Sequence, residues 1–186
     1  MNRKRTRWSC FALIATIAIP ASVSITLAEG AESKDEKIAR AMRAAPPSIS
    51  QNATIVDVDG TVLRPGTNGW TCMPGLWAGD DHPMCNDDVW VKLMKAIGAK
   101  AEFHTDRIGV SYMLAGDANA NNADPFDTKP DPGEVWVQEG AHLMVLLPDP
   151  KMLEGISNDP NNGGPYVMWK GTPYAHIMIP IAHREK

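Results

Sequence analysis

Apolar residues recur at the spacing of a helix in two parts of the chain. The first run follows a capping-box pair, Ser33 and Glu36. Its apolar positions have the i, i+3, i+4, i+7 pattern of one helix face: Ile38, Ala41, Met42 and Ala45. The second run starts after Asn86, a favourable N-cap residue, and ends at Gly98. Its apolar stripe consists of Trp90, Leu93, Met94 and Ile97. The pattern therefore predicts two main helices.

Most of the other apolar residues alternate with polar ones, which predicts half-buried strands. Asp59 and Gly60, between two β-rich runs, are typical of a hairpin turn. The predicted strands cover residues 53–58, 61–63, 108–114, 135–138, 142–147, 166–169 and 174–181. A short helix is predicted over residues 149–155, and long loops over residues 65–85 and 116–133. Because short turns join consecutive strands, we expect an α+β fold: a largely antiparallel sheet with both main helices on one face.

The first 28 residues have the layout of a secretory signal peptide. Four basic residues precede an apolar stretch over residues 10–19, and small residues before the site predict cleavage after Ala28. The alternative is an uncleaved anchor, but Pro20, Ser22 and Ser24 interrupt the apolar run. We therefore expect an exported protein, periplasmic or secreted.

The mature chain, residues 29–186, is expected to form a single α+β domain whose first residues, 29–37, are frayed. Cleavage leaves 18 − 4 = 14 basic residues against 22 acidic ones, a net charge of about −8. Such a charge disfavours nucleic acid as a partner. No membrane span is expected in the mature chain, because no apolar run in it is long enough.

Two cysteines remain after cleavage, Cys72 and Cys85. In an oxidising compartment they are expected to form a disulfide. The alternative is a reactive Cys85 thiol, because this residue precedes a predicted helix N-terminus.

A short internal repeat supplies the candidate metal site. Residues 141–145 (AHLMV) resemble residues 175–179 (AHIMI), and side chains two apart on a strand share a face. If the strands are neighbours, His142, Met144, His176 and Met178 converge, with His82 as an additional candidate. Imidazole and thioether groups suit a soft ion such as Cu(I), or zinc. The alternative is that these methionines fill the core.

Two further clusters are candidate binding sites. Oxygen-bearing side chains alternate along the long loop in a pattern that suits calcium, although such residues also form turns: Asp117, Asn119, Asn121, Asp124 and Asp127. Aromatic residues in or beside glycine-rich loops suit a stacked ligand, or cover a small core: Trp70, Trp77, Tyr166, Trp169 and Tyr174.

No catalytic motif of a known hydrolase, phosphate-binding loop or dinucleotide fingerprint is present in the sequence. A His142 or His176 base paired with an aspartate such as Asp149 is the enzymatic alternative. We therefore expect a binding module for a soft metal ion or small ligand. The alternatives are a hydrolase-type enzyme and an envelope interaction protein.

Four segments carry a resemblance that spans most of the mature chain: residues 67–74, 82–85, 139–150 and 163–180. They resemble a family of exported bacterial proteins to which no activity is assigned. The resemblance implies one intact domain of bacterial origin, and it carries no ligand or site residue with it.

Overall fold

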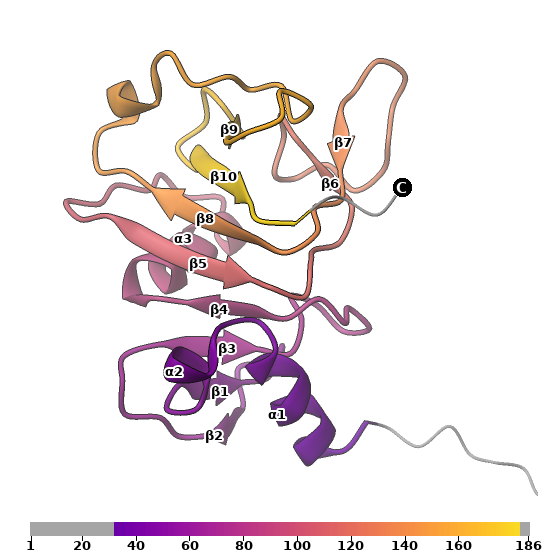
Figure 1. Cartoon of the computed structure of the whole chain (residues 1–186), viewed down its shortest axis with the longest axis vertical. Helices are drawn as coiled ribbons and strands as arrows, with labels where there is room; N and C mark the ends of the chain where they lie inside the picture. Colours follow the sequence, from indigo (N-terminus) through magenta and orange to yellow (C-terminus); the bar gives the residue numbers. More distant parts are fainter. Residues whose placement is uncertain (1–31, 183–186) are drawn as a thin grey trace, which may run out of the picture. The chain divides into compact units, whose positions relative to one another are not determined.

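The computed structural model describes residues 32–182, whose centre is an eight-stranded sheet (Figure 1). The predicted signal peptide lies outside the described residues. The strand order is β2-β1-β3-β4-β5-β8-β10-β9, and every neighbouring pair is antiparallel except β1 with β3. The strands are β1 (Thr54–Val56), β2 (Val62–Arg64), β3 (Thr71–Met73), β4 (Met84–Asn86), β5 (Gly109–Met113), β8 (His142–Leu146), β9 (Tyr166–Met168) and β10 (His176–Pro180). The predicted α+β class and largely antiparallel sheet are confirmed.

Three α-helices and one 3₁₀ turn accompany the sheet: α1 (Lys34–Met42), α2 (Pro47–Ser50), α3 (Asp88–Gly98) and η1 (Pro150–Leu153). Strands β6 (Ala120–Asn121) and β7 (Trp136–Val137) form a separate two-stranded ribbon. No helix within residues 32–182 has the length and apolar character needed to cross a membrane.

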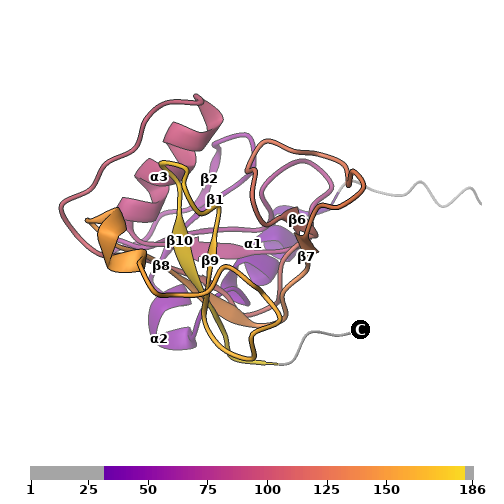
Figure 2. The same cartoon turned by 90° about the horizontal axis from the view of Figure 1, so that it is seen from above.

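The two main helices lie on opposite faces of the sheet, which corrects the prediction that they share one (Figure 2). Neighbours on a strand point to opposite faces. Met84 packs in one core cluster with Trp90 of α3, whereas Cys85 packs in the other with Ala41 of α1. Since β4 is buried on both faces, each face needs its own cover.

The disulfide between Cys72 and Cys85 is present, as predicted. The two residues are direct partners in the β3–β4 register. Strand β3 and the first two residues of β4 fall within the predicted loop over residues 65–85, because the glycines and prolines of this segment indicate turns. Asn86 belongs to β4, and Asp87 is the N-cap of α3, with its carboxylate accepting the Trp90 N–H at 2.9 Å.

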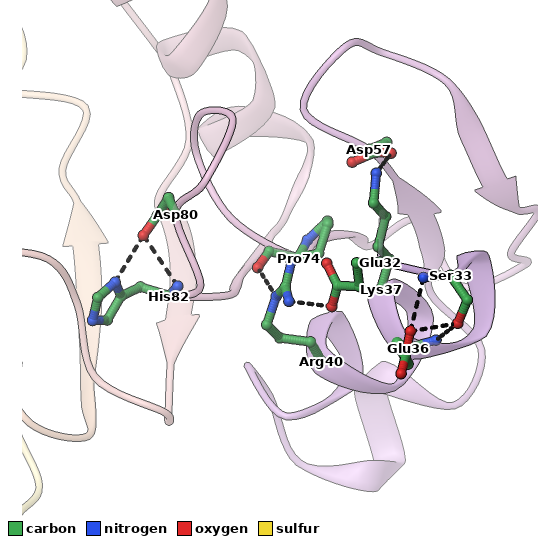
Figure 3. A network of polar contacts seen from close by, with 9 residues as sticks. All are labelled: Glu32, Ser33, Glu36, Lys37, Arg40, Asp57, Pro74, Asp80 and His82. Atoms are coloured by element: carbon green, nitrogen blue, oxygen red, sulfur yellow. Dashed lines mark hydrogen bonds and ion pairs between the residues drawn. The ribbon is translucent and has the colours of Figure 1, made fainter. Parts of the chain in front are cut away.

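Helix α1 begins inside the segment that we expected to be frayed. Residues 34–37 form its first turn, and Ser33 and Glu36 form the predicted capping box (Figure 3). Polar contacts attach the helix to the loops beside it. Lys37 Nζ lies 2.6 Å from a carboxylate oxygen of Asp57, and Arg40 Nε donates to the Pro74 carbonyl at 2.7 Å. These contacts order a segment whose charge alone suggested fraying.

Candidate functional site

A cavity of about 420 Å³ lies on the α3 side of the sheet. Six of the ten methionines in the chain line it: Met84, Met94, Met113, Met144, Met168 and Met178. Five of them come from five different strands and one from α3. We call the space that they and the other lining residues enclose the methionine cavity. A volume of roughly 300–1,000 Å³ with a largely apolar lining is typical of small-molecule sites.

Strand register explains why so many thioethers meet at this place. Met178 of β10 is the direct partner of Met144 of β8, and Met144 is in turn the partner of Ser111 on β5. Met113 and His176 share this face because they lie two residues from Ser111 and Met178 respectively. The half of α3 that carries Met94 covers the same face.

His176, which lines the cavity, has an unused nitrogen. The residue is 1% exposed, and its Nδ1 lies 3.0 Å from the Tyr174 carbonyl. A carbonyl only accepts, so Nδ1 carries the hydrogen and Nε2 carries a lone pair. Nε2 is buried and has no hydrogen-bond partner. Burial lowers the pKa of His176 to about 4, so the ring is neutral at physiological pH.

Two indoles enclose the His176 ring. Trp90 of α3 and Trp169 both meet it edge-on, at centroid distances of 5.2 and 4.9 Å. The Trp90 indole N–H is also buried without a partner. In contrast, the Trp169 indole donates to the Asn121 carbonyl at 2.9 Å, which ties it to the long loop. Two residues that line the cavity, His176 and Trp90, thus each hold a buried polar atom without a partner, one acceptor and one donor.

The predicted calcium loop forms the polar wall of the cavity. All five of its candidate residues are lining residues: Asp117, Asn119, Asn121, Asp124 and Asp127. Gly116, with φ +84°, turns the chain from β5 into this loop, and a Cβ there would lie 3.0 Å from the Glu139 carbonyl oxygen.

Side-chain oxygens of this loop hold its turns. Asp117 accepts the Glu139 N–H at 2.7 Å, Asp124 accepts the Phe126 N–H at 2.8 Å, and Asp127 accepts from the Asn121 amide at 2.9 Å. Within residues 32–182, these carboxylates do not form a cluster of three or more metal-ligating groups. The loop is therefore built as the turn-forming alternative describes.

His142 does not converge with His176. Its partner in the register is Pro180, which lies 180 − 176 = 4 residues from His176 on β10. This offset corresponds to about 13 Å along a strand. The His142 Nδ1 donates to the Gly140 carbonyl at 2.7 Å, and its Nε2 lies 3.8 Å from an Asp117 carboxylate oxygen. Burial lowers its pKa. The predicted four-residue metal site is thus reduced to His176, Met144 and Met178.

Of the five candidate aromatics, Trp77 and Trp169 line the cavity. The other three have different roles. Trp70 packs against Tyr112 on the opposite face, at a centroid distance of 5.5 Å. Tyr166 is buried and donates to a Glu139 carboxylate oxygen at 2.9 Å, and the Tyr174 hydroxyl donates to the Ala101 carbonyl at 2.8 Å. The aromatic groove predicted from the sequence is therefore only partly assembled.

His82 lies outside the cavity lining, in the loop between β3 and β4. Its Nδ1 is 2.7 Å from a carboxylate oxygen of the buried Asp80 (Figure 3). The same nitrogen is 3.4 Å from a carboxylate oxygen of Asp81. Asp80 also accepts the Leu76 N–H at 2.7 Å, so this pair braces the loop that carries Leu76 and Trp77 to the cavity.

The proposed pairing of a histidine base with Asp149 is not formed. Asp149 caps η1 through the Lys151 N–H at 2.9 Å, and the carboxylate near His142 belongs to Asp117. Sequence reasoning also missed lining residues, namely Trp90, Met94, Met113 and Met168. Their apolar periodicity predicts that they are buried. It does not distinguish a filled core from the lining of a cavity, so it did not indicate a site.

Comparison of the chain with protein-family models, with curated proteins and with solved structures gave no match.

Proposed function

We propose that this protein is a binding module that holds a small, largely apolar ligand in the methionine cavity. The observation that carries the proposal is the unused Nε2 of His176, a buried atom of a residue that lines a cavity of about 420 Å³. Buried polar atoms are nearly always hydrogen-bonded, because leaving one unpaired costs about 1–3 kcal/mol. A ligand or water that reached this nitrogen from the cavity would satisfy it.

Methionine and tryptophan side chains supply the rest of the binding energy. Thioethers are flexible and polarizable, so they adapt to ligands of different shape. Burying apolar ligand surface against them contributes roughly 25 cal/mol per Å² before the cost of association. The proposal therefore concerns ligands that fill the cavity with hydrocarbon or aromatic groups.

A cavity-filling substitution tests this function. Ala118 lines the cavity and is half-buried, so Ala118→Phe is expected to occupy the space without disturbing a helix or strand. The affinity of Ala118→Phe for 4-tert-butylbenzyl alcohol, measured by quenching of tryptophan fluorescence, should be about tenfold or more below that of the native chain. Ala115→Phe, at an exposed position outside the lining, is the matched control and should bind normally. Equal binding by both variants, or no saturable binding by the native chain, contradicts the proposal.

A soft metal ion is the second candidate ligand, and the His176 lone pair beside Met144 and Met178 favours it. Imidazole and thioether ligands prefer Cu(I) to harder ions. Silver(I) replaces Cu(I) in the test because it is not oxidised in air. After dialysis, elemental analysis should find about one silver per chain in the native protein. The count should fall in Met144→Leu/Met178→Leu, but not in Met152→Leu, whose residue is exposed. Equal silver in all three proteins contradicts a metal at this place.

A further inference from the structure

The methionine cavity has a marked charge asymmetry. Three aspartates line it, Asp117, Asp124 and Asp127, and no lysine or arginine within residues 32–182 does so. Lys100 lies close by, but its ammonium is over the Phe126 ring, 4.9 Å from the centroid. His176 adds no positive charge, because its pKa is about 4. Within residues 32–182, the lining thus carries formal negative charge and includes no lysine or arginine.

Charge and apolar surface occupy different depths of this cavity. Met178, Met113 and His176 are at most 2% exposed and form the floor. By contrast, Asp124 is exposed and Trp77 is 53% exposed, so these residues mark the mouth. Burial acts to raise the pKa of Asp127, but hydrogen bonds with the Lys129 N–H, the Asn121 amide and the Glu134 side chain together outweigh it and lower this pKa.

We propose that the ligand is an amphipathic cation, an amine or quaternary ammonium on an apolar body, with its charge at the mouth beside Asp124 and Trp77. The inference rests on the proposed function and names the class of its ligand. Carboxylates attract a cation, and the face of an indole stabilises one by a cation–π contact. The same wall repels fatty acids and other apolar anions. Independently of the acidic residues, the buried and unpartnered Nε2 of His176 marks this cavity as a ligand site.

Three probes with one apolar body and different charges test this inference. They are 4-tert-butylbenzylamine, the corresponding alcohol and 4-tert-butylbenzoate, which are cationic, neutral and anionic at neutral pH. In low salt the amine should bind roughly tenfold more tightly than the alcohol, and the benzoate more weakly than either. Added salt should reduce the advantage of the amine.

The outcomes separate the two proposals. If the alcohol binds as tightly as the amine, or the benzoate binds best, the cation inference is overturned while the cavity remains a binding site. If none of the three binds saturably, the proposed function fails and the inference fails with it.

Two matched charge variants test where the charge of the bound amine lies. Asp124→Asn keeps an oxygen that can accept the Phe126 N–H but removes one negative charge. Affinity for the amine should fall severalfold, and affinity for the alcohol should stay the same. Asp106→Asn removes an equal charge from an exposed position outside the cavity lining and should change neither affinity. An equal loss of amine affinity in both variants would overturn the placement of the charge at the mouth.

Discussion

His176 occupies a strand position between the core and the methionine cavity. Its Nδ1–H satisfies a backbone carbonyl, and its ring packs edge-on between Trp90 and Trp169. The remaining nitrogen, Nε2, carries a lone pair in a fixed direction. Such a lone pair can bind a metal ion or accept a hydrogen bond. The sequence identified this residue through its repeat with His142. It did not predict that a four-residue offset in the register would separate the two rings.

The same burial makes stability depend on pH. In the unfolded chain a histidine has a pKa of about 6.5, whereas His176 in the folded protein has a pKa of about 4. The unfolded chain therefore binds the proton first as pH falls. The contribution of His176 to the free energy of unfolding is fully present above the unfolded pKa and is lost as pH falls toward 4. The loss amounts to about 3 kcal/mol when complete.

Urea denaturation between about pH 7 and about pH 4.5 measures this effect. His176→Gln, which cannot titrate there, should lose less stability over this interval than the native chain. His104→Gln removes an exposed histidine and should follow the native chain. Carboxylates and His142 titrate in all three proteins. The informative quantity is therefore the difference between proteins in the slope of the free energy of unfolding against pH. Identical slopes for His176→Gln and the native chain would show that His176 is not buried as described.

At the scale of elements, the sequence predicted periodic segments well and missed strands that lie in the glycine- and proline-rich segments predicted as loops. Strands β5, β8 and β10 and helix α3 match their predicted segments, because each has enough residues to show its period. Strand β3 and the first two residues of β4 were hidden in a predicted loop. The prediction that both main helices lie on one face of the sheet was also wrong. Strand β4 is buried on both faces, and this is visible only once its neighbours are known.

At the scale of the whole molecule, three candidate sites that looked separate in sequence share one cavity. The histidine–methionine strands, the aspartate-rich loop and two of the tryptophans all line it. Long-range pairing produces this convergence: loop residue Asn121 accepts from Trp169, 48 positions later in the chain. Sequence spacing cannot reveal such contacts, whereas residue types did indicate the chemistry. Ligand binding in the methionine cavity is therefore the central claim about this molecule.

The methionines themselves report on this claim. In a spectrum of the protein with isotope-labelled methionine methyl groups, 4-tert-butylbenzylamine should shift the signals of Met84, Met94, Met113, Met144, Met168 and Met178. Met42, Met73 and Met152 are outside the cavity lining and should keep their positions, which makes them internal controls. A saturable shift confined to the first group is the predicted result. Binding that moves only the second group, or an unchanged spectrum at saturating probe, would contradict the account.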